Sequence, residues 1–438
     1  MTVEHRDRSD SSSVETIDLT GEWRVSLDPD DVGVESHWYD RSLQQPISLP
    51  GTTDEAELGD PSAGRETGHL TRAHRYEGPA WYQRQVDIPG DWETKRVTLR
   101  LERSRKTTVW VDDTEIGTRR SLSTPHDYDL SAAIDSTVHT LTIRVDNDSA
   151  PVSFDGVRNS HQASAETQTN WNGILGDIRL RATDPVWIDE ANVTFGGDGS
   201  TASVEIDVGN KTGSRATGRV RTWVPTATGE PVVDTIHDDV TIDSVGGSLS
   251  VECDLTGGEH RWDEFDPGTG ALSIELETET AGGEYGHETA VPFGCCAFER
   301  DGTQFSANGR TIFLRGTVDC CVFPTTGYAP MSVSEWRSVF ETAKRYGINH
   351  YRFHSWCPPE AAFTAADELG IYLQPELPLW GAVFESEAAK EFYYDEAEAI
   401  LDSYADHPSF TMFALGNELS GSERAAQSLV SHCREYDD

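Results

Sequence analysis

An asparagine–glutamate pair follows an apolar run near the C-terminal end of the chain. Residues 411–415 read TMFAL, which predicts a strand, and Gly416, Asn417 and Glu418 come directly after it. In proteins that alternate strands with helices, catalytic groups gather where the strands end. A glutamate held there by burial or beside a like charge can protonate a glycosidic oxygen, and the adjacent amide can hydrogen-bond a sugar hydroxyl. The alternative interpretation is a glutamate favoured only by the dipole of a following helix.

Polar and aromatic residues also follow the neighbouring predicted strands. Successive strand ends carry Arg315-Gly316 with Asp319-Cys320-Cys321, then Arg352, His354, Trp356 and Cys357, then Glu376 and Trp380. Because parallel strands end at one edge, we predict a single rim of carboxylates, donors and aromatic platforms, as a sugar site requires. Glu418 is the predicted catalytic residue, and the predicted substrate-binding residues are Asn417, Arg352, His354, Trp356, Glu376 and Trp380. Taken singly, Arg352 is also explained as the partner of a strand-end carboxylate, and Trp356 as packing.

Strands alternate with helices after Cys296. Ser332 and Glu335 form a capping box at the start of one predicted helix, and Gly347 ends that helix. The other predicted elements are strands at 350–353, 371–374 and 411–415 and helices at 359–369, 387–404 and 422–436. This alternation indicates parallel strands joined by crossover helices. It supplies about four β-α units where a TIM barrel has eight, so we expect either half a barrel or a small open α/β domain.

The first two-thirds of the chain has an all-β pattern. Alternating runs at 97–101, 108–111 and 140–145 are separated by Gly, Pro, Asp and Asn, and they predict a β jelly roll over residues 1–183. Residues 184–295 are polar and rich in Gly and Thr, which fits an immunoglobulin-like β-sandwich. Its candidate strands lie at 204–208, 219–224, 240–242, 249–253 and 271–276. Residues 296–438 form the third predicted domain, the N-terminal half of a TIM barrel.

The chain is strongly acidic. It has 76 Asp and Glu against 35 Lys and Arg, a formal net charge of −41, and few lysines among its basic residues. The charge is spread along every segment, so it predicts a solvated acidic surface that would repel nucleic-acid phosphates. Self-repulsion at ordinary salt would destabilise the fold. This composition resembles that of proteins from halophiles that accumulate salt.

The cysteines favour reduced thiols, because seven is an odd number and a disulfide framework needs pairs. The vicinal pairs Cys295-Cys296 and Cys320-Cys321 lack Cys-x-x-Cys spacing, and no histidine pattern accompanies them. We therefore expect buried thiols, with no metal and no other cofactor. The chain lacks a run of ~20 apolar residues, and residues 1–13 lack a hydrophobic signal-peptide core. These absences predict a cytoplasmic protein without a membrane partner.

Several motifs resemble glycoside hydrolase family 2. Asn308–Gly316 is similar to the hairpin that opens the barrel in that family, Asp367–Tyr372 to the approach to its third strand, and Leu415–Glu418 to its acid/base motif. Similarity to the family's sugar-binding jelly roll lies in LTGEWRVSLDP at 19–29, LPGTTD at 49–54, AWYQRQVDIP at 80–89 and TQTNWNGILGDIRL at 167–180. The resemblance implies a jelly roll, an immunoglobulin-like domain and a barrel in that order, with Asn417 and Glu418 in the active site.

The chain also departs from the family pattern. The run RFHSWCPP keeps Arg352 but displaces His354 by one residue from the family's histidine, and PELP keeps Glu376 but lacks the flanking Asp and Asn. Some family members bind Mg²⁺ near the site, and Glu376 falls at a matching position without the other ligands. A retaining mechanism also needs a second carboxylate ~5–5.5 Å from the first. The family carries that nucleophile on a later strand, beyond residue 438.

Two hypotheses of different classes follow. The first is a retaining exo-β-glycosidase, an O-glycosyl hydrolase, in which Glu418 protonates the leaving oxygen and then deprotonates water, while further sequence supplies the nucleophile. Galactosides, glucuronides and mannosides are all open as substrates. The second is a non-catalytic carbohydrate-binding remnant, or one half of a split enzyme. The expected partners are an oligosaccharide or glycoside, with a homo-oligomer or a complementing C-terminal half as the possible protein partners.

Overall fold

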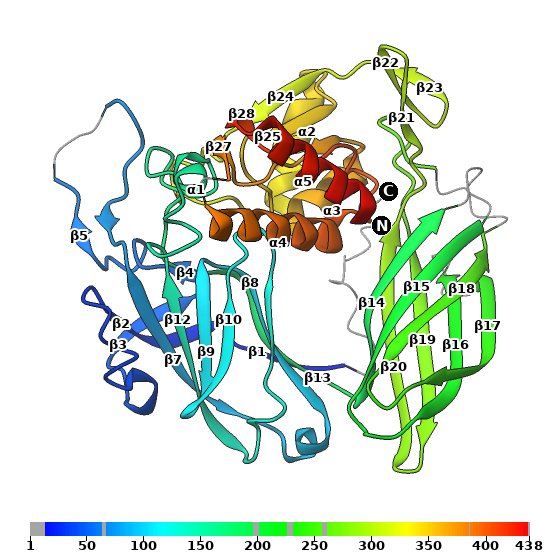
Figure 1. Cartoon of the computed structure of the whole chain (residues 1–438), viewed down its shortest axis with the longest axis horizontal. Helices are drawn as coiled ribbons and strands as arrows, with labels where there is room; N and C mark the ends of the chain where they lie inside the picture. The colour runs from blue at the N-terminus through cyan, green and yellow to red at the C-terminus, as the bar shows by residue number, and fades with distance from the viewer. Residues whose placement is uncertain are drawn as a thin grey trace.

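The computed structural model of the chain describes residues 14–63, 67–195, 201–225, 231–255, 261–384 and 386–436. Two β-sandwiches follow each other along the chain, and a region of mixed strands and helices lies across them (Figure 1). The predicted lack of a signal-peptide core concerns residues 1–13, which lie outside the described residues. Within the described ranges, no helix combines the length and the apolar character needed to span a membrane.

The first sandwich consists of two antiparallel sheets that bury the alternating apolar residues between them. One sheet has the order β1 (Glu15–Asp18), β13 (Gly173–Thr183), β8 (Arg96–Arg103), β11 (His126–Asp129), with β4 (Gly51–Thr52) also paired to β13. The other has the order β10 (Thr114–Arg119), β9 (Lys106–Val111), β12 (Val138–Asp146), β7 (Pro79–Asp87), β2 (Gly21–Leu27), β3 (Gln45–Leu49). Leu99 of β8, Val109 of β9 and Ile143 of β12 meet in this core because alternate residues of a strand face one side.

Short elements decorate this sandwich. They are η1 (Trp38–Asp40), β5 (Asp60–Pro61), β6 (His74–Arg75), η2 (Gly90–Thr94) and α1 (Asp155–Asn159). α1 matters most for function, because it lies against the C-terminal region and not against the sandwich core. Gly156 of α1 sits so close to that region that a Cβ atom there would come within 2.8 Å of Leu379 Cδ1.

The second sandwich packs three strands against four. The smaller sheet has the order β14 (Val186–Phe195), β15 (Thr201–Asn210), β18 (Gly247–Asp254). The larger has the order β17 (Pro231–Ile242), β16 (Ala216–Pro225), β19 (Gly270–Thr280), β20 (Gly283–Phe293). All five strands predicted for this part of the chain are present, and β14 and β20 are additional. Val204, Val220 and Ile274 belong to the core between the two sheets.

The C-terminal region begins with an antiparallel meander of β21 (Phe298–Asp301), β22 (Gln304–Ala307) and β23 (Arg310–Ile312). The predicted hairpin is confirmed, since Ala307 pairs with Arg310 across Asn308 and Gly309, which have φ of 51° and 75°. Positive φ at both central residues is the geometry that favours Asn-Gly in a two-residue turn.

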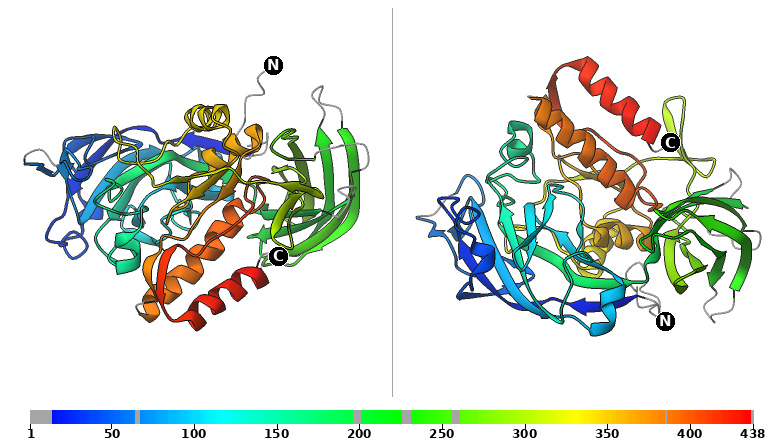
Figure 2. Two further views of the ribbon diagram at one scale, coloured as in Figure 1. Left: turned by 90° about the horizontal axis from the view of Figure 1, so that it is seen from above. Right: turned by 60° about the horizontal axis from the view of Figure 1, so that its bottom comes forward.

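Parallel strands with crossover helices follow the meander. β24 (Gly316–Asp319), β25 (His350–Phe353) and β26 (Tyr372–Gln374) form a parallel sheet, and β27 (Trp380–Val383) pairs in parallel with β28 (Asn417–Gly421). The helices are α2 (Val333–Arg345), α3 (Glu360–Leu369), α4 (Glu387–Tyr404) and α5 (Glu423–Tyr436). α5 lies alongside α4, as Figures 1 and 2 both show.

The sequence signals for α2 and α3 are confirmed by their caps. The Ser332 hydroxyl accepts a hydrogen bond from the Glu335 backbone N–H, as a capping box requires. Gly370 ends α3 with φ 68°, a left-handed conformation that suits glycine because it lacks a Cβ. The predicted bounds of α4 agree with the structure.

Two expectations about the strands are wrong. Residues 411–415 do not form a continuous strand: single parallel bridges join Phe410 to Leu373 and Ala414 to Glu376, and β28 begins only at Asn417. The neighbouring segment contains Pro375, which has no N–H to donate, so the ladder is interrupted. Arg315 lies at the start of the first parallel strand and not at its end.

The described residues form no closed barrel. Within them, β24 pairs on one side only, with β25, and the parallel arrangement continues through β26 to the bridges at Phe410 and Ala414. The protein is therefore a mostly β, multidomain structure with two β-sandwiches. The partial TIM barrel stays a prediction.

Candidate active site

Asn417 and Glu418 are placed by an interrupted ladder between two parallel segments. The bridges at Phe410 and Ala414 keep the same register, to within one residue, as the pairing of Asn417 with Trp380. Gly416 makes the close approach possible, because its φ is 133° and a Cβ atom there would lie 2.0 Å from the Leu379 carbonyl oxygen. Asn417 N–H donates to that same carbonyl oxygen at 2.9 Å. The Leu-Gly-Asn-Glu run therefore needs its glycine for a steric reason.

A charged network of Arg352 and Glu376 holds the Asn417 side chain in position. Arg352, at the end of β25, donates from Nε to Glu376 Oε1 at 2.5 Å and from Nη2 to Asn417 Oδ1 at 3.0 Å. Glu376 is fully buried, and its other oxygen accepts from the Ser355 backbone N–H at 2.7 Å. A buried carboxylate is stable only when it is paired and hydrogen-bonded, and both conditions are met here. This network fixes the Asn417 amide with its NH₂ group available for a ligand.

Glu376 is not in a state to bind Mg²⁺. Some family members hold Mg²⁺ near this position, but both Glu376 oxygens are already engaged by Arg352 and by the Ser355 N–H. Hard cations need several accessible oxygen ligands. The residues present at Glu376 therefore do not fit that ion.

Glu418 lies at the open side of the ladder. Its carboxylate accepts a hydrogen bond from Trp380 Nε1 at 2.9 Å, and its side chain is exposed, so burial, one of the two arrangements considered for a catalytic glutamate, is not present. The backbone of Glu418 has φ 45°, a conformation that costs free energy for a residue with a Cβ. Strain of this kind persists where the surrounding structure imposes it, and it concentrates at functional sites.

The first sandwich contributes a residue that sequence reasoning missed. His161 follows α1, and its backbone N–H donates to Ser355 Oγ at 3.0 Å. Its Nδ1 lies 2.9 Å from the His354 carbonyl oxygen and 2.7 Å from His354 Nδ1. Both imidazole rings contact the Trp380 indole, with centroid separations of 5.4 Å for His161 and 4.7 Å for His354. No local sequence signal marks His161, because its neighbours lie almost two hundred residues away.

Docking between the first sandwich and α4 holds His161 in place. The buried Glu396 carboxylate of α4 accepts from the Leu122 backbone N–H at 3.1 Å, and the Tyr404 hydroxyl donates to the Ser123 carbonyl at 3.0 Å. Arg120 forms exposed ion pairs with Glu391 and Asp395 at the same contact. The buried hydrogen bonds position the sandwich, since exposed pairs contribute little.

The predicted rim residues are brought together, with one difference in role. Trp356 is 2% exposed, packs against Trp336 and Phe353, and donates from Nε1 to the Asp319 carbonyl at 3.0 Å. Its ring faces are covered by protein, so it supports the rim from within. Asp319 is largely buried, and burial raises the pKa of its carboxyl to about 6.

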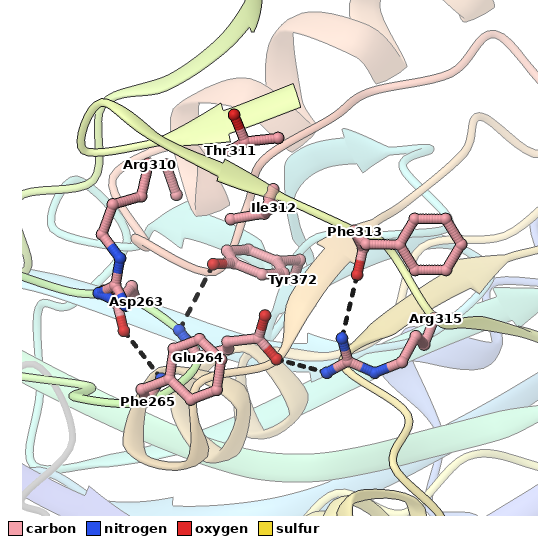
Figure 3. Close-up of a pocket in the computed structure, with 10 residues that line it drawn as sticks. Asp263, Glu264, Phe265, Arg310, Thr311, Ile312, Phe313, Arg315 and Tyr372 are labelled. Carbon is pink, nitrogen blue, oxygen red and sulfur yellow. Dashed lines mark hydrogen bonds and ion pairs between the residues drawn. The ribbon is translucent and has the colours of Figure 1, made fainter. Parts of the chain in front are cut away.

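Of two cavities among the described residues, the larger lies at the opposite end of the strands. It has a volume of about 160 Å³ and is lined by residues that include Glu264, Ile312, Arg315 and Tyr372 (Figure 3). Its charged groups are engaged with one another: Arg315 pairs with Glu264 at 2.6 Å, and Arg310 pairs with Asp263 at 3.2 Å. In α/β proteins the N-terminal end of the strands serves stability, so we do not assign chemistry to this cavity.

Comparisons with known proteins show what the chain resembles in sequence and fold. Residues 16–184 match the family described as glycosyl hydrolases family 2, sugar binding domain. The chain is 23% identical to the β-glucuronidase of Paenibacillus borealis over 93% of its own length and 68% of that protein. It is 23% identical to the exo-β-D-glucosaminidase of Amycolatopsis orientalis over 92% of its length, but it spans only 40% of that relative.

Residues 16–184 are a glycosyl hydrolases family 2 sugar-binding domain by this match, and the chain as a whole resembles β-glycosidases of that kind. The crystal structure of Bacteroides uniformis β-glucuronidase superimposes on 97% of this chain with a TM-score of 0.75, and the chain covers 51% of that structure. At 18% identity this likeness shows a shared fold alone. The sequence relatives are named as O-glycosyl hydrolases, and this chain is assigned to that enzyme class by resemblance.

Proposed function

We propose that the chain carries the acid/base half of a retaining β-glycosidase site that acts on terminal β-glycosides. The observation that supports this best is the exposed Glu418 carboxylate beside Asn417, on a strained backbone and hydrogen-bonded to Trp380. In this proposal Glu418 donates its proton to the glycosidic oxygen as the sugar leaves. It then removes a proton from the water that attacks the glycosyl–enzyme intermediate.

The other rim residues hold the sugar in this proposal. Asn417 donates its amide N–H to a ring hydroxyl, and Arg352 keeps that amide in position through its second hydrogen bond. Trp380 and His354 offer an aromatic and an imidazole surface next to Glu418. Glucuronides, galactosides and mannosides remain the candidate substrate classes, and relatives named as a β-glucuronidase and an exo-β-D-glucosaminidase support a β-linked sugar.

A second carboxylate is needed as nucleophile, and we propose that sequence outside this chain supplies it. Glu376 does not suit that role, because it is buried and both of its oxygens are engaged. The open side of β24 and the exposed apolar side chains of Val318 and Leu419 are consistent with further β-α units packing there. The proposed domains are therefore 1–183, 184–295 and 296–438, the last being the N-terminal half of a TIM barrel.

The alternative proposal is carbohydrate binding without catalysis. The match of residues 16–184 to a sugar-binding domain favours it, because that domain lies wholly within this chain. In this case the rim would bind a glycoside, alone or as half of a split enzyme, and Glu418 would serve as a hydrogen-bond acceptor only.

The test is hydrolysis of a panel of nitrophenyl β-glycosides in molar KCl. The salt screens the net charge of −41, which we propose reflects a halophilic, cytoplasmic origin. Glu418→Gln is compared with Glu387→Gln, an equivalent change at an exposed carboxylate of α4. Hydrolysis lost only in Glu418→Gln supports the acid/base role and identifies the sugar.

A folded chain that hydrolyses none of these glycosides would overturn independent catalysis. Addition of a separately produced C-terminal half from a family 2 relative then distinguishes a split enzyme from a binding protein. Activity that appears on addition and depends on Glu418 supports the split site. Saturable glycoside binding without activity supports the alternative.

A further inference from the structure

A histidine–cysteine cluster bridges the first sandwich and the rim. His161, Cys320 and His354 each offer a ligand atom, and the three atoms lie within 4.8 Å of one another. All three residues are partly buried, so they are shielded by protein yet accessible to a small ion. The proposed function gives the His354 ring a place beside the sugar but gives no role to His161 or Cys320, so the cluster calls for a separate explanation.

The backbone holds each member in position. His354 N–H donates to the Asp319 carbonyl at 2.9 Å, which fixes the strand ends that carry His354 and Cys320 side by side. His161 N–H is held by Ser355 Oγ at 3.0 Å. Ser355 itself has φ 54°, a left-handed conformation that turns the chain directly after His354. The cluster is thus pre-organised by groups that do not themselves bind the ion.

The hydrogen bonds of His161 match those of a metal ligand. Its Nδ1 lies 2.9 Å from the His354 carbonyl oxygen and 2.7 Å from His354 Nδ1. In the tautomer with the proton on His161 Nδ1, that N–H donates to one of these acceptors and the Nε2 lone pair is the one that can bind a metal. Histidines that bind metals commonly donate their other ring N–H to a carbonyl or carboxylate in this way. The same interaction fixes the tautomer and the orientation of the ring.

We propose that His161, Cys320 and His354 bind a transition-metal ion of the zinc class. Two imidazoles and one thiolate are ligands for Zn²⁺ and its neighbours, whereas Mg²⁺ and Ca²⁺ select oxygen ligands. Three protein ligands leave one tetrahedral position for water or a substrate oxygen. On binding, the metal takes up the Cys320 sulfur as thiolate, and the thiol proton passes to solvent.

The proposed metal site lies close to the proposed acid/base residue. Trp380 contacts both imidazole rings and donates a hydrogen bond to Glu418, so bound metal lies one side chain away from the proposed acid/base. The ion would also join residues from opposite sides of a domain contact, since His161 belongs to the first sandwich and the other two ligands to the C-terminal region. Metal binding is therefore expected to stabilise that contact.

The experiment titrates the purified chain with Co²⁺ and Zn²⁺ in molar KCl under a reductant that contains no thiol. Mg²⁺ is the matched negative probe. The native chain is expected to show Co²⁺–thiolate charge-transfer absorption that Zn²⁺ displaces, together with a rise in unfolding temperature on adding Zn²⁺. Because binding is the readout, the result stands whether or not the chain hydrolyses glycosides.

Single substitutions of the three proposed ligands test which residues bind the metal. Cys320→Ser, His161→Asn and His354→Asn are each expected to weaken Zn²⁺ binding by about 100-fold or more, since loss of an outer-shell partner alone costs 10–100-fold. Cys433→Ser and His432→Asn, on α5, are the controls and should bind as the native chain does. Circular dichroism of each variant confirms that it is folded.

Two results would overturn the proposal. One is a native chain that gives no Co²⁺–thiolate absorption and no Zn²⁺-dependent rise in unfolding temperature. The other is a folded Cys320→Ser chain that binds Zn²⁺ as tightly as the native chain does, which would place any metal elsewhere.

Discussion

The two ends of the parallel strands carry similar residues in different states. At the C-terminal end, Arg352 pairs with the buried Glu376, and next to them Glu418 and Asn417 remain accessible. At the N-terminal end, Arg315 pairs with Glu264 beside the larger cavity. Both ends therefore have an arginine–glutamate pair, and at the C-terminal end the exposed Glu418 carboxylate lies next to that pair.

This comparison shows that the position of the larger cavity does not predict where the proposed acid/base residue lies. At the N-terminal end, Arg315 also donates to the Gly347 carbonyl, so its guanidinium joins the second sandwich, a helix end and the meander. The N–H groups of Arg315 are therefore already hydrogen-bonded to groups of the protein. At the C-terminal end the pairing leaves groups unused, and groups that protein does not satisfy are the ones that can act on a ligand.

The largest expected effect compares the same substitution at both ends. In the chain complemented with a C-terminal half that supplies the nucleophile, Glu418→Gln should lower kcat/KM for β-glycosides by about 100- to 10,000-fold, the usual contribution of a general acid/base, with unfolding unchanged. Glu264→Gln should leave kcat/KM unchanged and lower the free energy of unfolding by about 2 kcal/mol, because it removes the charged partner of Arg315. Steady-state kinetics and urea denaturation in KCl measure the two.

Added azide sharpens this first comparison. Azide needs no general base to attack a glycosyl–enzyme intermediate, so it should restore turnover of an activated nitrophenyl glycoside in Glu418→Gln and produce a glycosyl azide. A loss of activity that azide leaves unchanged, together with a fall in stability, would assign Glu418 to structure and not to proton transfer.

The second effect tests the two arginine–glutamate pairs. Arg352→Met leaves Glu376 fully buried without its counter-charge, which should cost about 3–5 kcal/mol of unfolding free energy. Arg315→Met should cost less, about 2 kcal/mol, because it leaves the buried Glu264 unpaired but the Arg315 side chain is half-exposed, so water already weakens the interaction in the native chain. Equal losses in urea denaturation would show that burial does not distinguish the pairs.

The third effect is a pH dependence near the N-terminal end. Burial alone would lower the pKa of His407, but the carboxylates of Asp367 and Glu360 outweigh it and raise the pKa to about 10, from 6.5 in the unfolded chain. The stabilisation is therefore complete below pH 6.5 and is lost as the pH rises through about 10. His407→Gln should cost about 3 kcal/mol at pH 6 and much less near pH 10.

Unfolding free energies of the native chain and of His407→Gln, measured from pH 6 to pH 10, check this third effect. The native chain should lose stability over that range, and the variant should show a flatter profile. Parallel profiles would mean that His407 is not protonated between its two carboxylates.

The smallest effect concerns the lining of the larger cavity. Ile312 is partly buried where the meander meets Tyr372, so Ile312→Ala should lower the free energy of unfolding by about 1 kcal/mol. Glycoside hydrolysis and Zn²⁺ binding should not change. A fall in kcat/KM at this distance from Glu418 would break the assignment of the two ends to different tasks.

Local patterns in the sequence were enough for most of the elements. Apolar runs predicted β8, β9 and β12 of the first sandwich and five strands of the second, and the Ser332 capping box, Gly370 and Asn308-Gly309 predicted a helix start, a helix stop and a hairpin. The predicted strand at 411–415 failed because its pairing depends on a neighbour, and Pro375 in that neighbour interrupts the ladder. The place of Arg315 was also wrong, since strand order and strand start are not local properties.

Some features of the candidate site could also be predicted from local sequence, and others could not. Glu418, Asn417, Arg352 and Glu376 could be predicted from their positions after apolar runs, and the structure connects the last three through hydrogen bonds. The sequence could not show that Trp356 is buried and that its ring is therefore closed to a sugar, because burial depends on what packs around a side chain.

The sequence by itself determined the element types, the acidic surface and the likeness to family 2, because propensity, charge and short motifs are properties of neighbouring residues. Only the tertiary structure decided that His161 of the first sandwich meets Cys320 and His354, and that the rim and the cavity lie at opposite ends of the strands. Contacts between residues almost two hundred positions apart depend on how domains pack. That packing is the sum of many weak, non-local interactions, such as the docking of α4 on the first sandwich, which no short stretch of sequence encodes.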